Sequence, residues 1–206
     1  AGIGVASAAN LVRNGGFEEP RPGENTGFAG CTDGVLPDWA IGGDGIDQIR
    51  TFRASSQGSQ SLDLSRIGTG SISQLIPTTG SGSYTLSFDM AGDPSCGLTE
   101  RLLMVQWGDQ IPYGPYSFIP AGYPSAGPGG WQKVTLADLP GTAGGTGLVF
   151  EDVTSPSSAC GVALDNVIVT SQEFVPIPEF PDLVLPIGLL MGILGTVSSV
   201  RSTREQ

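Results

Sequence analysis

Ser83-Tyr84-Thr85-Leu86-Ser87-Phe88-Asp89-Met90 is the stretch of this sequence that alternates most regularly between polar and apolar side chains. Successive side chains of a β-strand point to opposite faces, so Tyr84, Leu86, Phe88 and Met90 would share one face of an extended chain. The polar side chains would share the other face. The stretch therefore predicts a strand with one face on a hydrophobic core and one in solvent, as in an antiparallel sheet.

Shorter alternating or apolar runs recur along the chain between turn-rich breaks such as 80–82 and 144–145. No segment shows the apolar stripe of an amphipathic helix, and glycine (32 residues) and proline (16 residues) are abundant. The further predicted strands are 11–12, 39–41, 46–52, 61–64, 71–76, 101–107, 132–136, 147–152 and 161–170. Ten such strands indicate an all-β fold, a two-sheet antiparallel jelly-roll sandwich. Trp39 and Trp107 are expected in its core.

The longest break, residues 108–130, contains three of the four tyrosines of the chain. We expect a loop without secondary structure of its own, and long loops of this kind are often functional. Tyr113, Tyr116 and Tyr123, together with Phe118, are candidates for stacking on sugar rings, because tyrosine combines apolar area with a polar tip. The alternative is that these rings pack onto the sheet.

The composition excludes several function classes. The chain has 20 Asp and Glu against 9 Lys and Arg, a net charge of −11, which argues against binding to nucleic acids or anionic membrane surfaces. The absence of histidine excludes Ser-His-Asp and Cys-His catalysis and His-ligated zinc. Glycoside hydrolysis would need two acids facing a cleft. Asp63, Asp89, Glu151 and Asp152 can be nominated, but their spacing does not separate them from surface acids, so we expect no enzyme.

A series of short motifs follows in order along the predicted domain. They are Asn10-Leu11-Val12-Arg13-Asn14-Gly15-Gly16-Phe17-Glu18, Pro37-Asp38-Trp39, Gly58-Ser59-Gln60-Ser61-Leu62-Asp63-Leu64, Ile72-Ser73-Gln74, Tyr84-Thr85-Leu86-Ser87-Phe88 and Cys160-Gly161-Val162-Ala163-Leu164-Asp165-Asn166-Val167. In this order they resemble galactose-binding-like jelly rolls, in particular the microbial choice-of-anchor C domain and a plant cell-wall family catalogued as a domain of unknown function. The resemblance spans residues 10–170 and implies a fold, but jelly rolls host many functions.

The chain has three cysteines, so one is left over when two of them pair in an exported protein. Plant members of the family that the chain resembles carry cysteines at the positions of Cys96 and Cys160. The resemblance therefore implies a Cys96–Cys160 disulfide, with Cys31 unpaired and either buried or available to another chain. The alternative is a bond between Cys31 and one of the other two cysteines.

Glu18 and Asp165 lie in the first and the last predicted strand segments. Related carbohydrate-binding domains use an acid from each of these positions, with backbone carbonyls, to hold a structural Ca²⁺, which takes six to eight oxygen ligands. The resemblance therefore implies a structural calcium site at Glu18 and Asp165, with Asp47 as a third candidate ligand. The alternative is that these carboxylates are solvated or hydrogen-bonded.

The C-terminal end joins the motif Pro178-Glu179-Phe180-Pro181 to an uncharged apolar run over 183–200 and to the basic residues Arg201 and Arg204. Eighteen helical residues rise about 27 Å, close to the hydrocarbon thickness of a bilayer, and the basic end favours a cytoplasmic tail. This order resembles the PEF-type sorting signals of archaeal surface proteins, which implies cleavage near Pro178, Glu179 and Phe180 by an archaeosortase, a sortase-like membrane transpeptidase. A plain single-pass anchor is the alternative.

The N-terminal end also indicates export, because Ala6-Ser7-Ala8 fits the small-x-small pattern at which signal peptides are cleaved. An ordered first strand is the alternative. The predicted organisation is a signal-peptide remnant (1–8), a jelly-roll domain (9–171), a proline-rich stalk (172–182), a transmembrane helix (183–200) and a basic cytoplasmic tail (201–206).

These features predict an exported, surface-anchored jelly-roll module of an archaeal-type cell envelope that binds carbohydrate without catalysis. The expected partners are an extracellular glycan, the sortase-like transpeptidase and the membrane, and not nucleic acid. The alternative is a structural, self-associating surface-coat protein. The unpaired Cys31 and the GxxxG pattern at 188–192, which is typical of associating membrane helices, motivate that alternative.

Overall fold

The computed structural model of the chain describes residues 8–20, 26–28, 36–50, 53–92, 99–110, 112–119 and 130–172. The chain divides into two units, Ala1–Gln172 and Glu173–Gln206, and all described residues belong to the first. Several predicted features lie outside the described residues: most of the signal-peptide remnant (1–7), Cys31, Cys96, Tyr123, the sorting motif at Pro178, Glu179 and Phe180, the helix 183–200, and Arg201 and Arg204. Among the described residues, no helix has the length and apolar character needed to cross a membrane.

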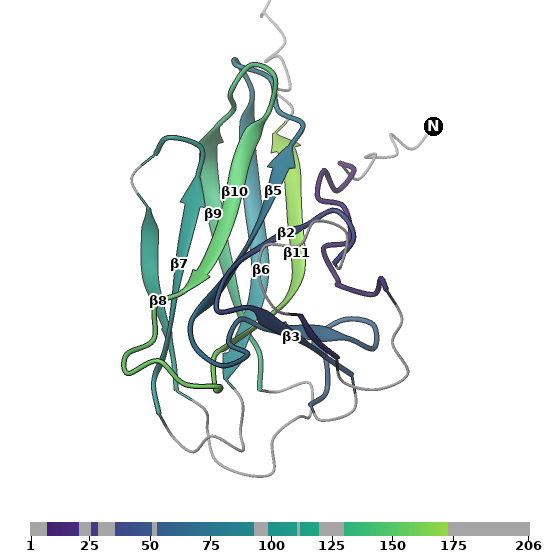
Figure 1. Cartoon of the computed structure of the whole chain (residues 1–206). Helices are drawn as coiled ribbons and strands as arrows, with labels where there is room; N and C mark the ends of the chain where they lie inside the picture. The colour runs from purple at the N-terminus through teal and green to yellow at the C-terminus, as the bar shows by residue number, and fades with distance from the viewer. Residues whose placement is uncertain are drawn as a thin grey trace, which may run out of the picture. The chain divides into compact units, whose positions relative to one another are not determined.

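The described strands form two antiparallel sheets, which are drawn as two layers in Figure 1. The six-stranded sheet has, in spatial order, β1 (Thr26–Phe28), β3 (Ile46–Ile49), β4 (Ser61–Asp63), β11 (Val162–Gln172), β6 (Ser83–Gly92) and β9 (Gln132–Pro140). The five-stranded sheet has β2 (Ala40–Gly43), β5 (Gly70–Ile76), β10 (Thr146–Asp152), β7 (Arg101–Trp107) and β8 (Tyr113–Phe118). The predicted all-β, two-sheet antiparallel sandwich is confirmed.

Strand β6 contains the alternating stretch and lies between β11 and β9. Its four apolar side chains are buried, and Phe88 is fully enclosed, with its ring edge-on to Phe150 at a centroid distance of 5.0 Å. Trp39 and Trp107 are buried in the same core, as predicted. The alternation of this strand is therefore explained by the packing of its apolar face against the five-stranded sheet.

Two expectations about secondary structure are wrong. Residues 11–12 form no strand, because Asn14 and Phe17 have positive φ and the segment turns instead of extending. Residues 108–130 are not all loop, because β8 pairs with β7 from Arg101 opposite Phe118 to Val105 opposite Tyr113. Gly114, at φ 114°, allows the irregular register of this pair.

Candidate functional site

The outer face of the five-stranded sheet carries small side chains where β2, β5 and β10 lie side by side. The side chains that face the core alternate with those that face outward. Ala40 and Val149 both pair with Ser73, and Gly147 pairs with Leu75. The outward residues are thus mostly small and leave room for a ligand above the sheet.

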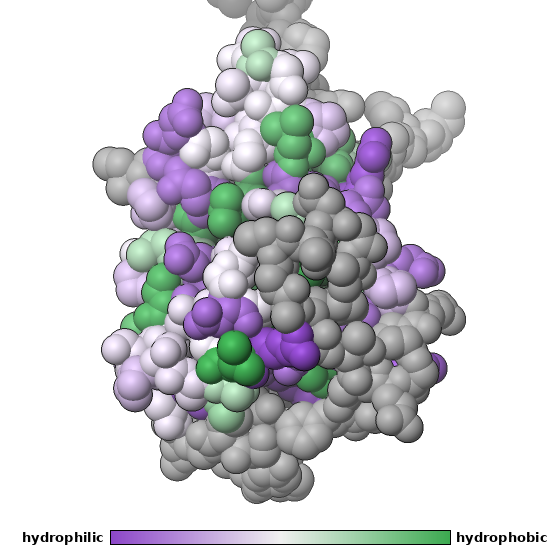
Figure 2. All heavy atoms as spheres, viewed as in Figure 1, coloured by the Kyte–Doolittle hydropathy of each residue, from purple (hydrophilic) through white to green (hydrophobic). Residues whose placement is uncertain are grey.

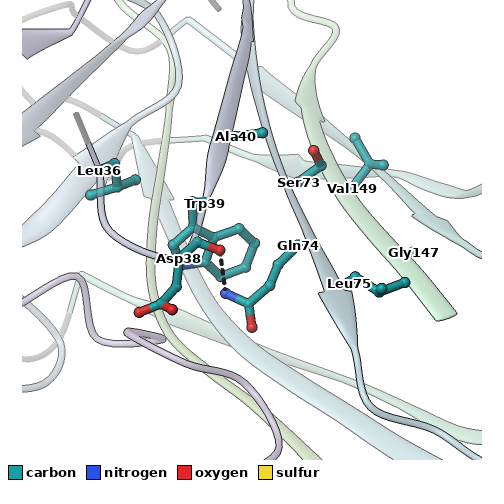
Figure 3. A pocket seen from close by; sticks show the side chains of 9 residues that line it. All are labelled: Leu36, Asp38, Trp39, Ala40, Ser73, Gln74, Leu75, Gly147 and Val149. Carbon is teal, nitrogen blue, oxygen red and sulfur yellow. Dashed lines mark hydrogen bonds between the residues drawn. The ribbon is translucent and has the colours of Figure 1, made fainter. Parts of the chain in front are cut away.

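Two adjoining hollows lie on this face. The larger, of about 590 Å³, is lined by Leu36, Asp38, Trp39, Ala40, Ser73, Gln74, Leu75, Gly147 and Val149, as Figure 3 shows. The smaller, of about 350 Å³, is lined by Leu11, Arg13, Asp38, Gln74, Leu75, Pro77 and Gly144. Because Asp38, Gln74 and Leu75 line both, we treat the two hollows as one groove. Its size falls in the range of small-molecule sites.

Gln74 fixes the polar wall of the groove. Its side-chain nitrogen donates hydrogen bonds to the backbone oxygens of Arg13 (2.9 Å) and Asp38 (3.0 Å), and its side-chain oxygen accepts one from the Arg13 N–H (2.9 Å). The bond to Asp38 is drawn in Figure 3. One side chain of β5 thereby holds two loop segments in register beside the sheet.

Asp38 and Arg13 are the charged groups of the groove wall. Asp38 lies in a tight turn with φ 68°, in which the Trp39 N–H donates to the Leu36 carbonyl oxygen. The Arg13 Nη1 and Asp38 Oδ1 atoms are 3.8 Å apart, and the two side chains are 81% and 38% exposed. Because both side chains are exposed, both groups are accessible to a ligand, and an exposed pair of this kind adds little stability.

Leu75 gives the groove an apolar edge. It is 68% exposed, which makes it one of the large exposed hydrophobic side chains among the described residues, together with Ile67 and Ile119. Figure 2 shows the apolar side chains of this view in separate small patches between polar ones. A carboxylate, a guanidinium and an aliphatic side chain side by side can accept hydrogen bonds from hydroxyls, donate hydrogen bonds to ring oxygens and pack against the C–H face of a sugar.

The tyrosines predicted to stack on sugars do not lie in this groove. Tyr113, Tyr116 and Phe118 belong to β8 and are partly buried against the core. The ring of Tyr116 meets Phe88 edge-on at 6.0 Å, and burial raises the pKa of Tyr116. The structure thus places these three rings as the alternative interpretation has them, packed onto the sheet.

Three of the four acids nominated for catalysis make hydrogen bonds or ion pairs within the fold. Asp63 accepts a hydrogen bond from the Gly161 N–H (3.1 Å) and lies 3.9 Å from the buried Arg53 guanidinium. Asp152 accepts from the N–H groups of Thr154 and Val162. Asp89 is bound by Lys133 at 2.9 Å. Glu151 stands on the exposed face of β10.

The three acids assigned to calcium are not brought together. Within the described parts of the chain, no three His, Cys, Asp or Glu side chains group closely enough to hold a metal ion. Glu18 and Asp165 instead accept hydrogen bonds from backbone N–H groups of residues 56–60. Burial raises the pKa of Asp47, and Arg66 opposes that shift. A structural calcium site at these residues stays a prediction.

Cys160 is disulfide-bonded. Its partner must be Cys31 or Cys96, since the chain has three cysteines, and both of these lie outside the described residues. The Cys96–Cys160 pairing therefore stays a prediction.

Asp165 is a buried carboxylate next to a second acid. Its side chain has no exposed surface. Ser56 Oγ lies 2.9 Å from Asp89 Oδ2 and 3.1 Å from Asp165 Oδ2. Burial raises the pKa of Asp165 to about 6, although hydrogen bonds from Gln57, Asn166 and Ser56 lower it. Burial acts in the same direction on Asp89, but hydrogen bonds from Asn166, Lys133 and Ser56 leave its pKa lowered.

We expect the stability contribution of Asp165 to fall as the pH rises. The folded state keeps the Asp165 proton up to about pH 6, whereas the unfolded chain releases it near its ordinary value of 3.8. The contribution is therefore complete below about pH 4 and lost by about pH 6, on the order of 3 kcal/mol. Asn does not titrate, so the unfolding free energy of wild type minus that of Asp165→Asn should fall by about 3 kcal/mol from pH 4 to pH 7. Urea unfolding of both proteins across this range measures this signed difference, and a rise with pH would contradict the assignment.

The groove residues were not predicted as a site from the sequence. Asp38 lies in the motif Pro37-Asp38-Trp39, which indicates the family but not a binding site. Arg13 and Gln74 also lie in quoted motifs, but their meeting depends on a contact between residues 61 positions apart.

Comparisons with known proteins agree with the fold. The family model described as "Protein of unknown function (DUF642)" matches residues 10–170. Halomucin of Haloquadratum walsbyi (strain DSM 16790 / HBSQ001) is 30% identical over 182 residues, 83% of this chain but 2% of Halomucin. The chain therefore spans a small fraction of that relative.

Solved structures of very different sequence share the architecture. TmCBM61, solved in complex with β-1,4-galactotriose, has a TM-score of 0.52 at 13% identity and covers 80% of this chain and 100% of its own. The MgGH51 α-L-arabinofuranosidase has a TM-score of 0.52 at 13% identity, over 83% of this chain and 28% of its own. A cyclase from Fischerella sp. TAU has a TM-score of 0.50 at 15% identity, over 80% and 98%. These likenesses establish the fold alone.

Proposed function

Because the chain belongs to the DUF642 family, a family of unknown function, we propose its function from the groove: a non-catalytic module that binds a glycan chain across β2, β5 and β10. The observation that carries this proposal is the solvent-facing Leu75 beside the exposed Arg13–Asp38 pair, in two hollows that share a wall. A neighbour of the same fold that was solved with an oligosaccharide, TmCBM61, supports it as an analogy.

The charge of the chain favours neutral glycans. With a net charge of −11, the protein repels polyanions such as uronate-rich polysaccharides. Asp38 would accept hydrogen bonds from sugar hydroxyls, Arg13 would donate hydrogen bonds to hydroxyl or ring oxygens, and Leu75 would cover an apolar ring face. None of these roles requires a proton-transfer or nucleophilic group.

The cellular setting in this proposal comes from the sequence. We propose export, anchoring at the cell surface through the C-terminal segment, and processing near Pro178, Glu179 and Phe180 by a sortase-like enzyme. A Cys96–Cys160 disulfide would suit an exported domain. A glycan-binding groove on an anchored domain would hold the cell surface to a polysaccharide of the envelope or of neighbouring cells.

A calorimetric titration of the full chain against neutral oligosaccharides, beginning with β-1,4-galactotriose, and against uronate-containing ones tests the proposal. We expect binding to a neutral glycan and a loss of about tenfold in affinity in Asp38→Asn, equivalent to ~1.4 kcal/mol. Asparagine keeps the size of the side chain and tolerates positive φ, so the change removes the charge with little strain.

Asp109→Asn is the matched control, because Asp109 is exposed and lies outside the groove. It should bind as the wild type does. If neither kind of glycan binds, glycan binding is wrong, and self-association at high concentration would then favour the surface-coat function. Equal binding by Asp38→Asn and wild type would place the glycan elsewhere.

A further inference from the structure

Two buried glutamine side chains, Gln48 and Gln60, meet the same two backbone oxygens. Gln48 Nε2 donates hydrogen bonds to the backbone oxygens of Phe17 (2.8 Å) and Pro20 (3.0 Å). Gln60 Nε2 donates to the same two oxygens, at 2.8 and 3.2 Å. The two glutamines are 0% and 1% exposed. Two nitrogens and two oxygens thus alternate in a closed ring inside the protein.

The fold brings these groups together from three parts of the chain. Gln48 lies in β3 opposite Leu62 of β4, and Gln60, two residues before Leu62, therefore lies on the same side of the sheet. Phe17 has a φ of 55°, and its fully buried ring packs 5.7 Å from that of Trp39. A bulky residue adopts such a backbone conformation only where its surroundings impose it, so core packing holds the Phe17 carbonyl in place.

The side-chain oxygens of both glutamines are left over. Gln48 Oε1 and Gln60 Oε1 are buried and accept no hydrogen bond from any residue that the structure describes. Gln74 Nε2 also donates to two backbone oxygens, but Gln74 Oε1 accepts a hydrogen bond from the Arg13 N–H. Buried polar atoms without a partner are rare, because they have given up water and gained nothing. Gln48 and Gln60 therefore lack a partner that Gln74 has.

A cation would be that partner. The two ends of a carboxamide have nearly the same shape, so a half-turn about the Cγ–Cδ bond exchanges Nε2 and Oε1. After this turn at Gln48 and Gln60, the ring would consist of four oxygens with the present separations of 2.8–3.2 Å. Ligand oxygens about 2.4 Å from a Ca²⁺ ion are about 2.8 Å apart in a pentagonal plane. Oxygens at this spacing repel one another unless a cation lies among them.

We propose that the side-chain oxygens of Gln48 and Gln60 and the backbone oxygens of Phe17 and Pro20 form a low-affinity Ca²⁺ site. The site that the family resemblance implies is made of carboxylates, whereas this one contains none. Calcium affinity falls with the number of charged ligands, so a neutral set predicts a dissociation constant of roughly 10⁻⁴–10⁻³ M, with water completing the shell. The bound ion would join the N-terminal segment to β3 and β4.

Thermal unfolding of the full chain, first in EDTA and then with calcium, tests the inference. The wild-type melting temperature should rise saturably, by about 5 °C in about 10 mM CaCl₂. NaCl at the same ionic strength controls for screening of the net charge of −11 and should have a much smaller effect. No rise with calcium, or an equal rise with NaCl, would overturn the site.

Replacement of Gln60 by glutamate distinguishes a metal ligand from a hydrogen-bond donor. Gln60→Glu keeps an oxygen but has no N–H group for the two backbone oxygens, so its melting temperature in EDTA should be lower than that of wild type. Calcium should restore it, with an affinity about tenfold higher than in wild type because a charged ligand has been added. A loss that calcium does not restore would mean that Gln60 serves only as a donor, and would overturn the site.

Gln106→Glu is the matched control, because Gln106 Nε2 also donates to two backbone oxygens, those of Gly108 and Gln110. Calcium should not restore the stability lost in this variant. Gln48→Leu should fold less stably than wild type and show no response to calcium. A calcium response in Gln48→Leu equal to that of wild type would place the ion elsewhere and overturn the proposal.

NMR of the side-chain amide groups in the wild-type chain keeps the inference testable if the variants fail to fold. Titration with CaCl₂ should shift the NH₂ signals of Gln48 and Gln60 saturably, because both groups leave the ring when the ion binds. The NH₂ signal of Gln74, whose side-chain oxygen already has a donor, should stay unchanged. Signals of Gln48 and Gln60 that do not move with calcium would contradict the site.

Discussion

Replacement of Phe88 by alanine is expected to lower the free energy of unfolding by about 3–5 kcal/mol, the usual cost of removing a large ring from a packed core. Phe88 is fully buried in β6, and its ring meets those of Phe150 and Tyr116. The five-stranded sheet supplies both of these partners. The cavity would therefore open between the two sheets, where neither can easily collapse.

Urea unfolding of the full chain measures this loss, and Phe118→Ala is the matched control. Phe118 is partly buried at the edge strand β8, so its removal should cost clearly less than that of Phe88. Equal losses for the two variants would mean that β6 does not hold the centre of the core.

The second large effect concerns binding. Leu75→Ser should weaken glycan affinity by about tenfold and leave stability nearly unchanged. Leu75 lines both hollows and is 68% exposed in the free protein, so most of its apolar area remains to be covered by a ligand. Covering about two thirds of a leucine side chain contributes roughly 1–2 kcal/mol.

Ile67→Ser is the control for this change, because Ile67 is 76% exposed and lines neither hollow. Calorimetry should find its affinity equal to that of wild type. A similar loss of affinity in both variants would indicate a general effect of surface polarity, and no loss in Leu75→Ser would remove the apolar edge from the site.

Much of the fold could be predicted because alternation is a local property. The apolar side chains of residues 83–90 are all buried in β6, and the runs at 71–76, 101–107 and 147–152 are strands β5, β7 and β10. Strand β8 was missed because Gly114 and Pro115 weaken its pattern. It exists because the edge of β7 pairs with it, and such tertiary pairing overrides local propensity.

The site was harder to predict because it depends on long-range contacts. The aromatic residues of β8 were predicted to stack on a ligand because tyrosines are concentrated there. Their rings instead pack, partly buried, against the core. In the sequence, Gln74 is not distinguished from any other polar residue of a strand. Its position in the groove wall is shown only by its hydrogen bonds with Arg13 and Asp38. Glu18 and Asp165 were identified as a pair, but the segment between them was not.

Backbone amide shift mapping of the isotope-labelled full chain with the tightest-binding neutral glycan tests the groove most directly. The proposed function predicts that the largest shifts on titration fall on the outward residues of β2, β5 and β10 and on the adjoining turn. These residues are Asp38, Ala40, Ser73, Leu75, Gly147 and Val149. Shifts confined to other parts of the domain, or no shifts with any glycan of the panel, would contradict glycan binding at this site.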